Sequence, residues 1–418
     1  MDRTPIASWS SRKPSKSRWG VAIAALVLGG ASLWFSTAFT ASIVLSVRDP
    51  SRALMAWPTS SARSTAAALI TTGPAAADNL GEACGYASQA LAVSAVDAMA
   101  VRVLALCQTV RGDQKQGRAL FQYGEALSRR DLPTQLWFIE DRVGQGDING
   151  ALLHYDRAMR TSTEVRDLLL PVLVQASNNV DIARQVGKIL AGRPDWWSDF
   201  LGRFVERATT PESLAELATQ MRLDFSSDLE RHRLMTVLDR LIDFQRFGLA
   251  KKLYDRTVPG AGAALLDDGG FANDRPVPPI GWRLIDHPEH SGVREPRGSG
   301  SDGNALSIRG ADGGEVARKL LVLPPGTYQL SAVVGDAANP RETPASVVIA
   351  CAGPSTGQLG SADFATSRSP AALDIRFSVP VSGCTGQWLS VKAPYGGDAL
   401  SDDPWIDSFR LARDGNQP

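Results

Sequence analysis

Four histidines are the side chains in this 418-residue sequence that most directly suggest metal or acid–base chemistry: His154, His232, His287 and His290. The last two lie in the run Asp-His-Pro-Glu-His, a spacing at which two imidazoles could bind one metal ion. A proline inside the run and the surrounding loop argue against a clamp of defined geometry, so we interpret these histidines as loop residues. His154 and His232 lie in segments expected to be helical, where we expect them to pack or to cap.

Stacking of a sugar on an aromatic ring is a second chemistry that the sequence suggests, at Trp388. In residues 387–392, Leu389 and Val391 alternate with Trp388 and Lys392, so the first pair should face a core and the second pair solvent. The same alternation in residues 327–334 and 373–379 directs a further polar set outward: Gln329, Asp374 and Arg376. An outward tryptophan beside planar polar groups provides a stacking face and hydrogen-bonding groups for a sugar. The alternative is that a loop or a second domain covers these residues.

Short runs of alternating apolar residues, separated by Gly and Pro, must position this surface. They occupy residues 305–310, 318–336, 345–353, 373–381, 386–394 and 404–413. No helical pattern lies between them. Residues 264–414 therefore predict an antiparallel β-sandwich.

Four local features follow one another in this half of the chain: Gly269-Gly270-Phe271, Gly281-Trp282, Pro325-Gly326-Thr327-Tyr328 and Ile406-Asp407. Their order resembles that of the jelly-roll carbohydrate-binding and galactose-binding-like families. The resemblance implies a jelly roll whose first strand is the Asp-, Gly- and Pro-rich stretch 265–284. Many members also hold a structural calcium with the help of an acidic residue after the phenylalanine, where this sequence has Ala272. Three other carboxylates could supply oxygen ligands here: Asp267, Asp268 and Asp407.

The preceding half, residues 78–260, shows amphipathic helical segments with a 34-residue period. Residues 34 apart correspond: Gly112 and Gly146, Asp113 and Asp147, Phe121 and Tyr155, with Asp181 and Ile189 continuing the series. Such a period predicts a solenoid of helical hairpins. Small and aromatic residues at Ala151, Tyr155 and Ala158, and again at Ala250 and Tyr254, make the region resemble the tetratricopeptide family. The resemblance implies a concave surface for a peptide or a protein partner, with the aromatic residues packed between repeats.

The N-terminal region indicates a membrane segment. Residues 20–47 contain no charged side chain over 28 positions, long enough to span a bilayer. Basic residues in the tail 1–19 place that tail in the cytoplasm and the rest of the chain outside it. We therefore expect one transmembrane anchor in the inner membrane, an Ala-, Ser- and Pro-rich stalk at residues 48–77, and a periplasmic body. The alternative is a signal peptide cleaved after Ser36-Thr37-Ala38.

The four cysteines form one close pair in each half of the exported chain: Cys84 with Cys107, and Cys351 with Cys384. This distribution favours two disulfides in an oxidising compartment. The alternative is four buried free thiols.

Charge and motifs restrict the function classes. The chain has 44 basic and 44 acidic residues, so we do not expect nucleic acid as a partner. We find no serine-nucleophile elbow, phosphate-binding loop or dinucleotide glycine motif. Apart from a structural calcium, no cofactor is expected. We predict a non-enzymatic bacterial envelope scaffold whose helices dock a protein and whose sandwich binds glycan, in the assembly or export of cell-surface polysaccharide. The alternatives are a glycan-active hydrolase or lyase, whose paired carboxylates leave no local motif, and a sandwich that is a structural cap.

Overall fold

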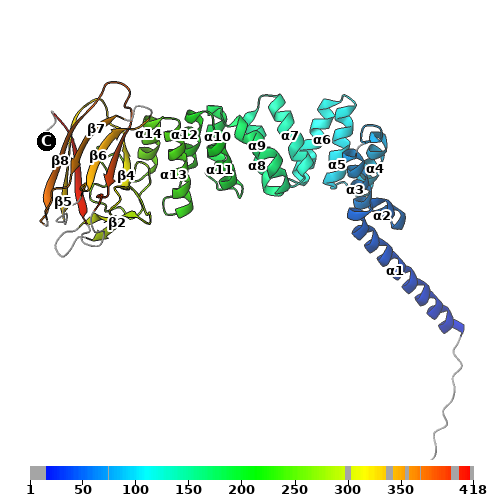
Figure 1. The fold of residues 1–418 in the computed structure, drawn as a ribbon. Coiled ribbons are helices and arrows are strands. Elements are labelled where there is room, and N and C mark those ends of the chain that lie inside the picture. The colour runs from blue at the N-terminus through cyan, green and yellow to red at the C-terminus, as the bar shows by residue number, and fades with distance from the viewer. Residues whose placement is uncertain are drawn as a thin grey trace, which may run out of the picture. The chain divides into compact units, whose positions relative to one another are not determined.

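The computed structural model describes residues 16–73, 75–296, 303–335, 342–353, 357–367, 369–396 and 404–414 (Figure 1). Its contacts divide the chain between Thr161 and Ser162 into two compact units, and each is described by itself. The described residues form fourteen helices followed by ten strands. The predicted combination of a helical region and an all-β region is therefore confirmed.

The first helix, α1 (Lys16–Arg48), contains the apolar segment predicted from the sequence. Within the described residues, 24–48 are the single helical stretch long and apolar enough to cross a membrane, and a signal sequence would meet the same criteria. The predicted cytoplasmic tail lies mostly outside the described residues, because these begin at Lys16.

The prediction of a stalk at residues 48–77 is wrong. Most of this segment forms two packed helices, α2 (Pro50–Ala56) and α3 (Ser60–Thr72). The small residues on α3, among them the fully buried Ala62 and Ala67, allow close packing against neighbouring helices. The Ser42 hydroxyl of α1 donates to the Trp57 carbonyl at 2.6 Å. The Ala- and Ser-rich composition therefore reflects helix packing rather than an extended linker.

The rest of the first unit consists of α4 (Leu80–Val93), α5 (Ala98–Val110), α6 (Gln114–Leu127), α7 (Leu132–Gly144) and α8 (Ile148–Thr161). The turns before α6 and α8 share one geometry, since Gly112 and Gly146 have φ values of 93° and 73°. Asp113 and Asp147 follow them, and each accepts a backbone N–H of the next helix at 3.0 and 2.9 Å. The 34-residue correspondence is real at this turn.

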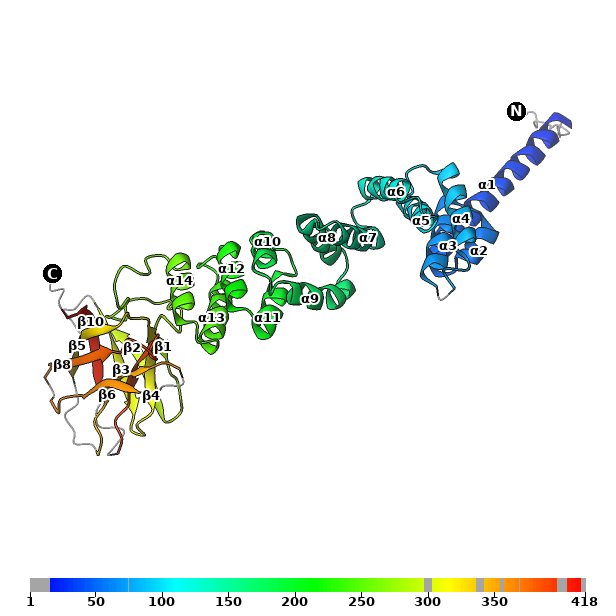
Figure 2. The same cartoon turned by 90° about the horizontal axis from the view of Figure 1, so that it is seen from above.

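The helices of the second unit are α9 (Glu164–Ala176), α10 (Val180–Leu190), α11 (Trp197–Arg207), α12 (Pro211–Met221), α13 (Asp228–Asp243) and α14 (Phe247–Thr257). Figure 2 shows two rows, α10, α12 and α14 in one and α9, α11 and α13 in the other. The third predicted copy is shifted, because Asn179 rather than Asp181 caps α10. Phe121 and Tyr254 are buried as predicted, and Tyr155 is half-buried. Membership of the tetratricopeptide family stays a prediction.

The strands form two five-stranded antiparallel sheets. The first sheet has the order β1 (Arg283–Leu284), β4 (Glu315–Leu321), β9 (Gln387–Lys392), β6 (Ser346–Cys351) and β7 (Gln358–Asp363). The second has the order β2 (His290–Pro296), β3 (Asn304–Gly310), β10 (Trp405–Arg413), β5 (Gly326–Gly335) and β8 (Ala371–Val379). Every predicted run contains a strand, and the inward residues of both sheets share one core. The predicted sandwich is confirmed.

The prediction of a first strand over residues 265–284 is also wrong. This stretch is a series of turns that reaches strand conformation only at Arg283. Asp268 and Phe271 have φ values of 56° and 52°, which interrupt an extended backbone. The rings of Phe271 and Trp282 nevertheless lie 4.9 Å apart in the core, and the Trp282 indole N–H donates to the Asp268 carbonyl at 2.9 Å. The segment closes one end of the core without forming a strand.

Candidate functional site

Trp388 lies on the outer face of the first sheet, as strand alternation predicts. Its neighbours Leu389 and Val391 are fully buried in the sandwich core, and Lys392 is exposed. The Arg318 guanidinium, on the adjacent strand β4, lies 4.9 Å from the centroid of the Trp388 ring. The aromatic ring is half-buried and has a cation over it.

Polar groups surround this ring. Arg318 Nε lies 3.6 Å from Glu315 Oε1 and has no hydrogen-bond partner within the described part of the chain. The Ser390 hydroxyl donates to Glu315 Oε2 at 2.5 Å. The side chains of Arg318 and Glu315 are 37% and 30% exposed, so both remain accessible to a ligand. We call Trp388, Arg318, Glu315, Ser390 and Lys392 the Trp388 surface.

The other predicted sugar-binding residues do not share this face, which corrects the predicted surface. Gln329 on β5 and Asp374 and Arg376 on β8 belong to the second sheet, on the opposite side of the sandwich. Gln329 Nε2 donates to Asp374 Oδ1 at 3.3 Å, and Arg376 Nε lies 3.3 Å from Asp414 Oδ2. The alternation correctly predicted which side chains of each strand face outward. It cannot tell which of two sheets a strand joins.

One end of the Trp388 surface contacts the helices of the same unit. A Cβ atom on Gly386 would lie 2.6 Å from Cγ of Phe247, the first residue of α14. Arg283, on β1, pairs with Asp239 of α13 at 2.8 Å. The predicted alternative, that another part of the chain covers this face, therefore holds at the Gly386 end of β9.

The three aspartates predicted as calcium ligands do not form one ligand group. Within the described residues, Asp267, Asp268 and Asp407 are not gathered as a cluster of carboxylates. Each already accepts a backbone N–H, from Gly262, Asn273 and Ser408 in turn. A positive side chain is also present, since Lys319 Nζ donates to the Asp267 carbonyl at 2.5 Å and has both Asp267 and Asp268 as charged neighbours. As arranged, the three aspartates do not form a calcium site, and the ammonium group of Lys319 places a positive charge near two of them.

Lys319 was missed by sequence reasoning. It is 2% exposed, and burial lowers the pKa of its ammonium group to about 8, against the opposing effect of Asp268 and Asp267. The ammonium also lies 5.3 Å from the Trp282 ring centroid. The alternation in β4 could have predicted that Lys319 is buried. Residues 317, 319 and 321 of β4 all face inward, opposite the inward residues of β9.

The histidines divide into three environments. His154 is buried in the first unit, where Nδ1 lies 2.7 Å from Gln135 Oε1 and the ring stacks on Phe138 at 4.5 Å. Burial lowers its pKa, against the opposing charge of Glu125. His232 is exposed on α13, so the predicted packing role is wrong there. His287 and His290 face each other across a tight hairpin rather than an irregular loop.

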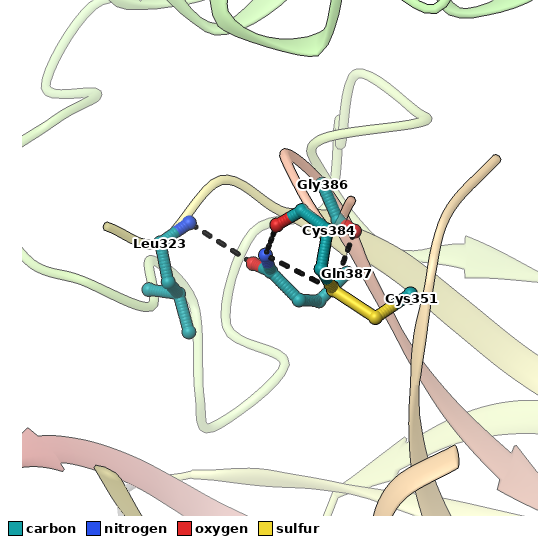
Figure 3. The surroundings of a disulfide bond; sticks show 5 residues. All are labelled: Leu323, Cys351, Cys384, Gly386 and Gln387. Atoms are coloured by element: carbon teal, nitrogen blue, oxygen red, sulfur yellow. Dashed lines mark hydrogen bonds between the residues drawn. A yellow bond between two sulfur atoms is a disulfide. The ribbon is translucent and has the colours of Figure 1, made fainter. Parts of the chain in front are cut away.

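Both predicted cysteine pairs are bonded: Cys84 with Cys107, and Cys351 with Cys384. The second bond joins the end of β6 to the segment before β9 (Figure 3). Beside it the buried Gln387 side chain accepts from Leu323 N at 3.0 Å and donates to the Cys384 carbonyl at 2.8 Å. The predicted neighbourhood of these strand ends is confirmed.

No family model and no curated protein matches the chain. Several similar solved structures are carbohydrate-binding modules. A CBM4 structure is 15% identical, covers 35% of this chain and 99% of its own, and has a TM-score of 0.28. TmCBM61 in complex with beta-1,4-galactotriose is 18% identical, with coverages of 36% and 99% and a TM-score of 0.25. A cyclase from Fischerella sp. TAU is 14% identical, with coverages of 37% and 98% and a TM-score of 0.28.

Proposed function

We propose that this chain is a membrane-anchored, exported, non-enzymatic binding protein whose sandwich binds glycan at the Trp388 surface. One observation carries the proposal: the guanidinium of Arg318, a side chain that is 37% exposed, lies 4.9 Å from the centroid of the half-buried Trp388 ring. A partly exposed guanidinium beside an aromatic ring is suited to a ligand that offers both an apolar face and hydroxyl groups.

The remaining members of the Trp388 surface match the same ligand. Glu315, which accepts the hydroxyl of the buried Ser390, provides carboxylate oxygens, and the exposed Lys392 provides an ammonium group at the far end of β9. On the outer face of the second sheet, Gln329 and Asp374 bond each other and Arg376 pairs with Asp414. These three predicted residues supply no aromatic ring for stacking.

The proposal is tested by glycan-array binding of the full chain in detergent micelles. Trp388→Ala and Arg318→Ala should each weaken binding by on the order of 1 to 3 kcal/mol, about five- to 150-fold, because stacked aromatic residues and arginines are typical anchors. Gln329→Ala and Arg376→Ala are matched controls on the opposite face and should bind normally. Loss of binding in the controls alone, or no glycan binding by the unmodified chain, would refute the proposed site.

A second candidate function, a structural cap, is favoured by the contact between Phe247 and Gly386. Phe247 is 3% exposed, and Arg283 of β1 pairs with Asp239 of α13. A helical repeat array requires its last hydrophobic face to be covered, and the sandwich would cover it here. Both functions are compatible, since the Arg318 side of the Trp388 surface remains partly exposed.

We also propose that the helical hairpins dock a protein partner and that the setting is the assembly or export of cell-surface polysaccharide. The apolar stretch 24–48 supports an anchored protein, with residues beyond it outside the cytoplasm. Alkaline phosphatase fused after Asp78 should be active, whereas a cytoplasmic reporter at the same site should be silent. The alternative is a glycan-active enzyme. If the chain released reducing ends from a panel of polysaccharides, the enzyme would replace the non-enzymatic binding protein as the proposed function.

A further inference from the structure

Three potential metal ligands come together at the edge of the sandwich, outside the Trp388 surface. One donor atom each from His287, His290 and Asp312 lies within 4.8 Å of the other two. The sequence run Asp-His-Pro-Glu-His did not reveal this group, because its third member lies 22 residues beyond His290. Two imidazoles and one carboxylate are a donor set that binds divalent transition metals.

The two histidines are positioned by a hairpin. His287 N donates to the His290 carbonyl at 3.0 Å and His290 N donates to the His287 carbonyl at 3.2 Å, so only two residues lie between them. Residues paired in this way project from the same face. Their rings are accordingly stacked, with centroids 4.6 Å apart. The proline inside the run helps to form the turn rather than separating the imidazoles.

The carboxylate is held from the opposite side. Asp312 Oδ2 lies 2.8 Å from His290 Nδ1, and Asp312 Oδ1 accepts the Gly314 N–H at 3.0 Å. The backbone of Asp312 also pairs with Tyr395. A Cβ atom on Gly314 would lie 2.3 Å from the His290 ring, so only glycine leaves the ring its place. The site is therefore built by fixed backbone on both sides.

We propose that His287, His290 and Asp312 bind one Zn²⁺ ion, with water completing the coordination from the solvent side. Ligand atoms around zinc lie roughly 3.4 Å apart, so small side-chain rotations would convert the present contacts into coordination, and the ion replaces the proton shared by His290 and Asp312. The side chains of His290 and Asp312 are 14% and 31% exposed, which leaves a path for the ion and the water.

The position of the site suggests what the ion does. The hairpin of His287 and His290 connects β1 of the first sheet to β2 of the second, and the turn of Asp312 connects β3 of the second sheet to β4 of the first. An ion bound by both turns would join two connections that cross between the sheets. We therefore expect the bound ion to stabilise this edge of the sandwich.

Zinc titration of the full chain, without a histidine tag and in detergent after chelator treatment, tests the proposal. Isothermal titration should show one high-affinity Zn²⁺ per chain, and zinc should raise the melting temperature. His287→Ala and Asp312→Asn should each weaken zinc binding at least about tenfold and remove most of the thermal shift. His287 is exposed, so its replacement leaves the core intact.

His232→Ala is the matched control, because His232 is an exposed histidine outside the group. It should bind zinc as the unmodified chain does. Cobalt should give visible absorption bands in the unmodified chain and in the control, and lose them in both site variants. Equal zinc affinity in the unmodified chain and the His287→Ala/Asp312→Asn double variant, with both folded by circular dichroism, would overturn the site.

Discussion

The ammonium group of Lys319 lies 5.3 Å from the ring centroid of Trp282, inside the core of the sandwich. It donates to the Asp267 carbonyl at 2.5 Å, and the carboxylates of Asp268 and Asp267 attract it through charge. The same two aspartates belong to the sequence pattern that suggested calcium. The positive charge near Asp267 and Asp268 is therefore the Lys319 ammonium group of the chain itself.

Lys319 makes the free energy of unfolding depend on pH in the alkaline range. Its pKa falls from 10.5 when exposed to about 8 in the fold, so the unfolded chain holds the proton more tightly. Below about pH 8 the buried charge costs on the order of 3 kcal/mol, and this cost disappears as pH rises to about 10.5. Relative to Lys319→Met, the unmodified chain should gain stability over that interval in urea unfolding. A pH-independent difference between the two would contradict this.

His154 makes stability depend on mildly acidic pH. Burial lowers its pKa below 6.5, so as pH falls below about 6.5 the unfolded chain binds a proton that the folded chain does not. Stability should therefore decrease with falling pH, and His154→Gln should reduce that dependence. Thermal melts between about pH 5 and pH 7 measure it. The exposed His232→Gln is the control, and an equal effect of both substitutions would rule out burial as the cause.

The Gly386 contact can be tested by a double-mutant cycle. Gly386→Ala should destabilise the protein by about 1 to 3 kcal/mol, because the new methyl group would lie 2.6 Å from Cγ of Phe247. In a Phe247→Ala background the same change should cost much less, since the obstructing ring is gone. Denaturant unfolding of the four proteins gives the coupling energy. Additive effects would mean that the two residues are not in contact.

The Cys351–Cys384 bond should contribute to stability. It closes a loop across a sequence separation of 33 residues, which corresponds to roughly 4 kcal/mol in the chain-entropy description. The Cys351→Ala/Cys384→Ala double variant should unfold at lower denaturant concentration, and reductant should destabilise it less than it destabilises the unmodified chain, because only Cys84–Cys107 is left to reduce. Peptide mapping of exported protein without reductant should recover the linked pair. Two free thiols at these positions would contradict the prediction.

The sequence by itself determined properties that depend on neighbouring residues along the chain. Apolar alternation located the strands and placed Leu389 and Val391 in the core with Trp388 outside, because successive side chains of a strand face opposite sides. The turns at Gly112 and Gly146 could also be predicted from the sequence, since a positive φ is a local property of the backbone that favours glycine. The pairing of the cysteines followed from their distribution.

Only the tertiary structure decided which distant residues meet. Trp388 and Gln329 both face outward, yet they lie on opposite sheets, because local alternation carries no information about strand order. Lys319 reaches Asp267 over 52 residues, and Asp312 reaches His290 over 22. Each side chain acquires its partner only once the strands have paired and the core has closed.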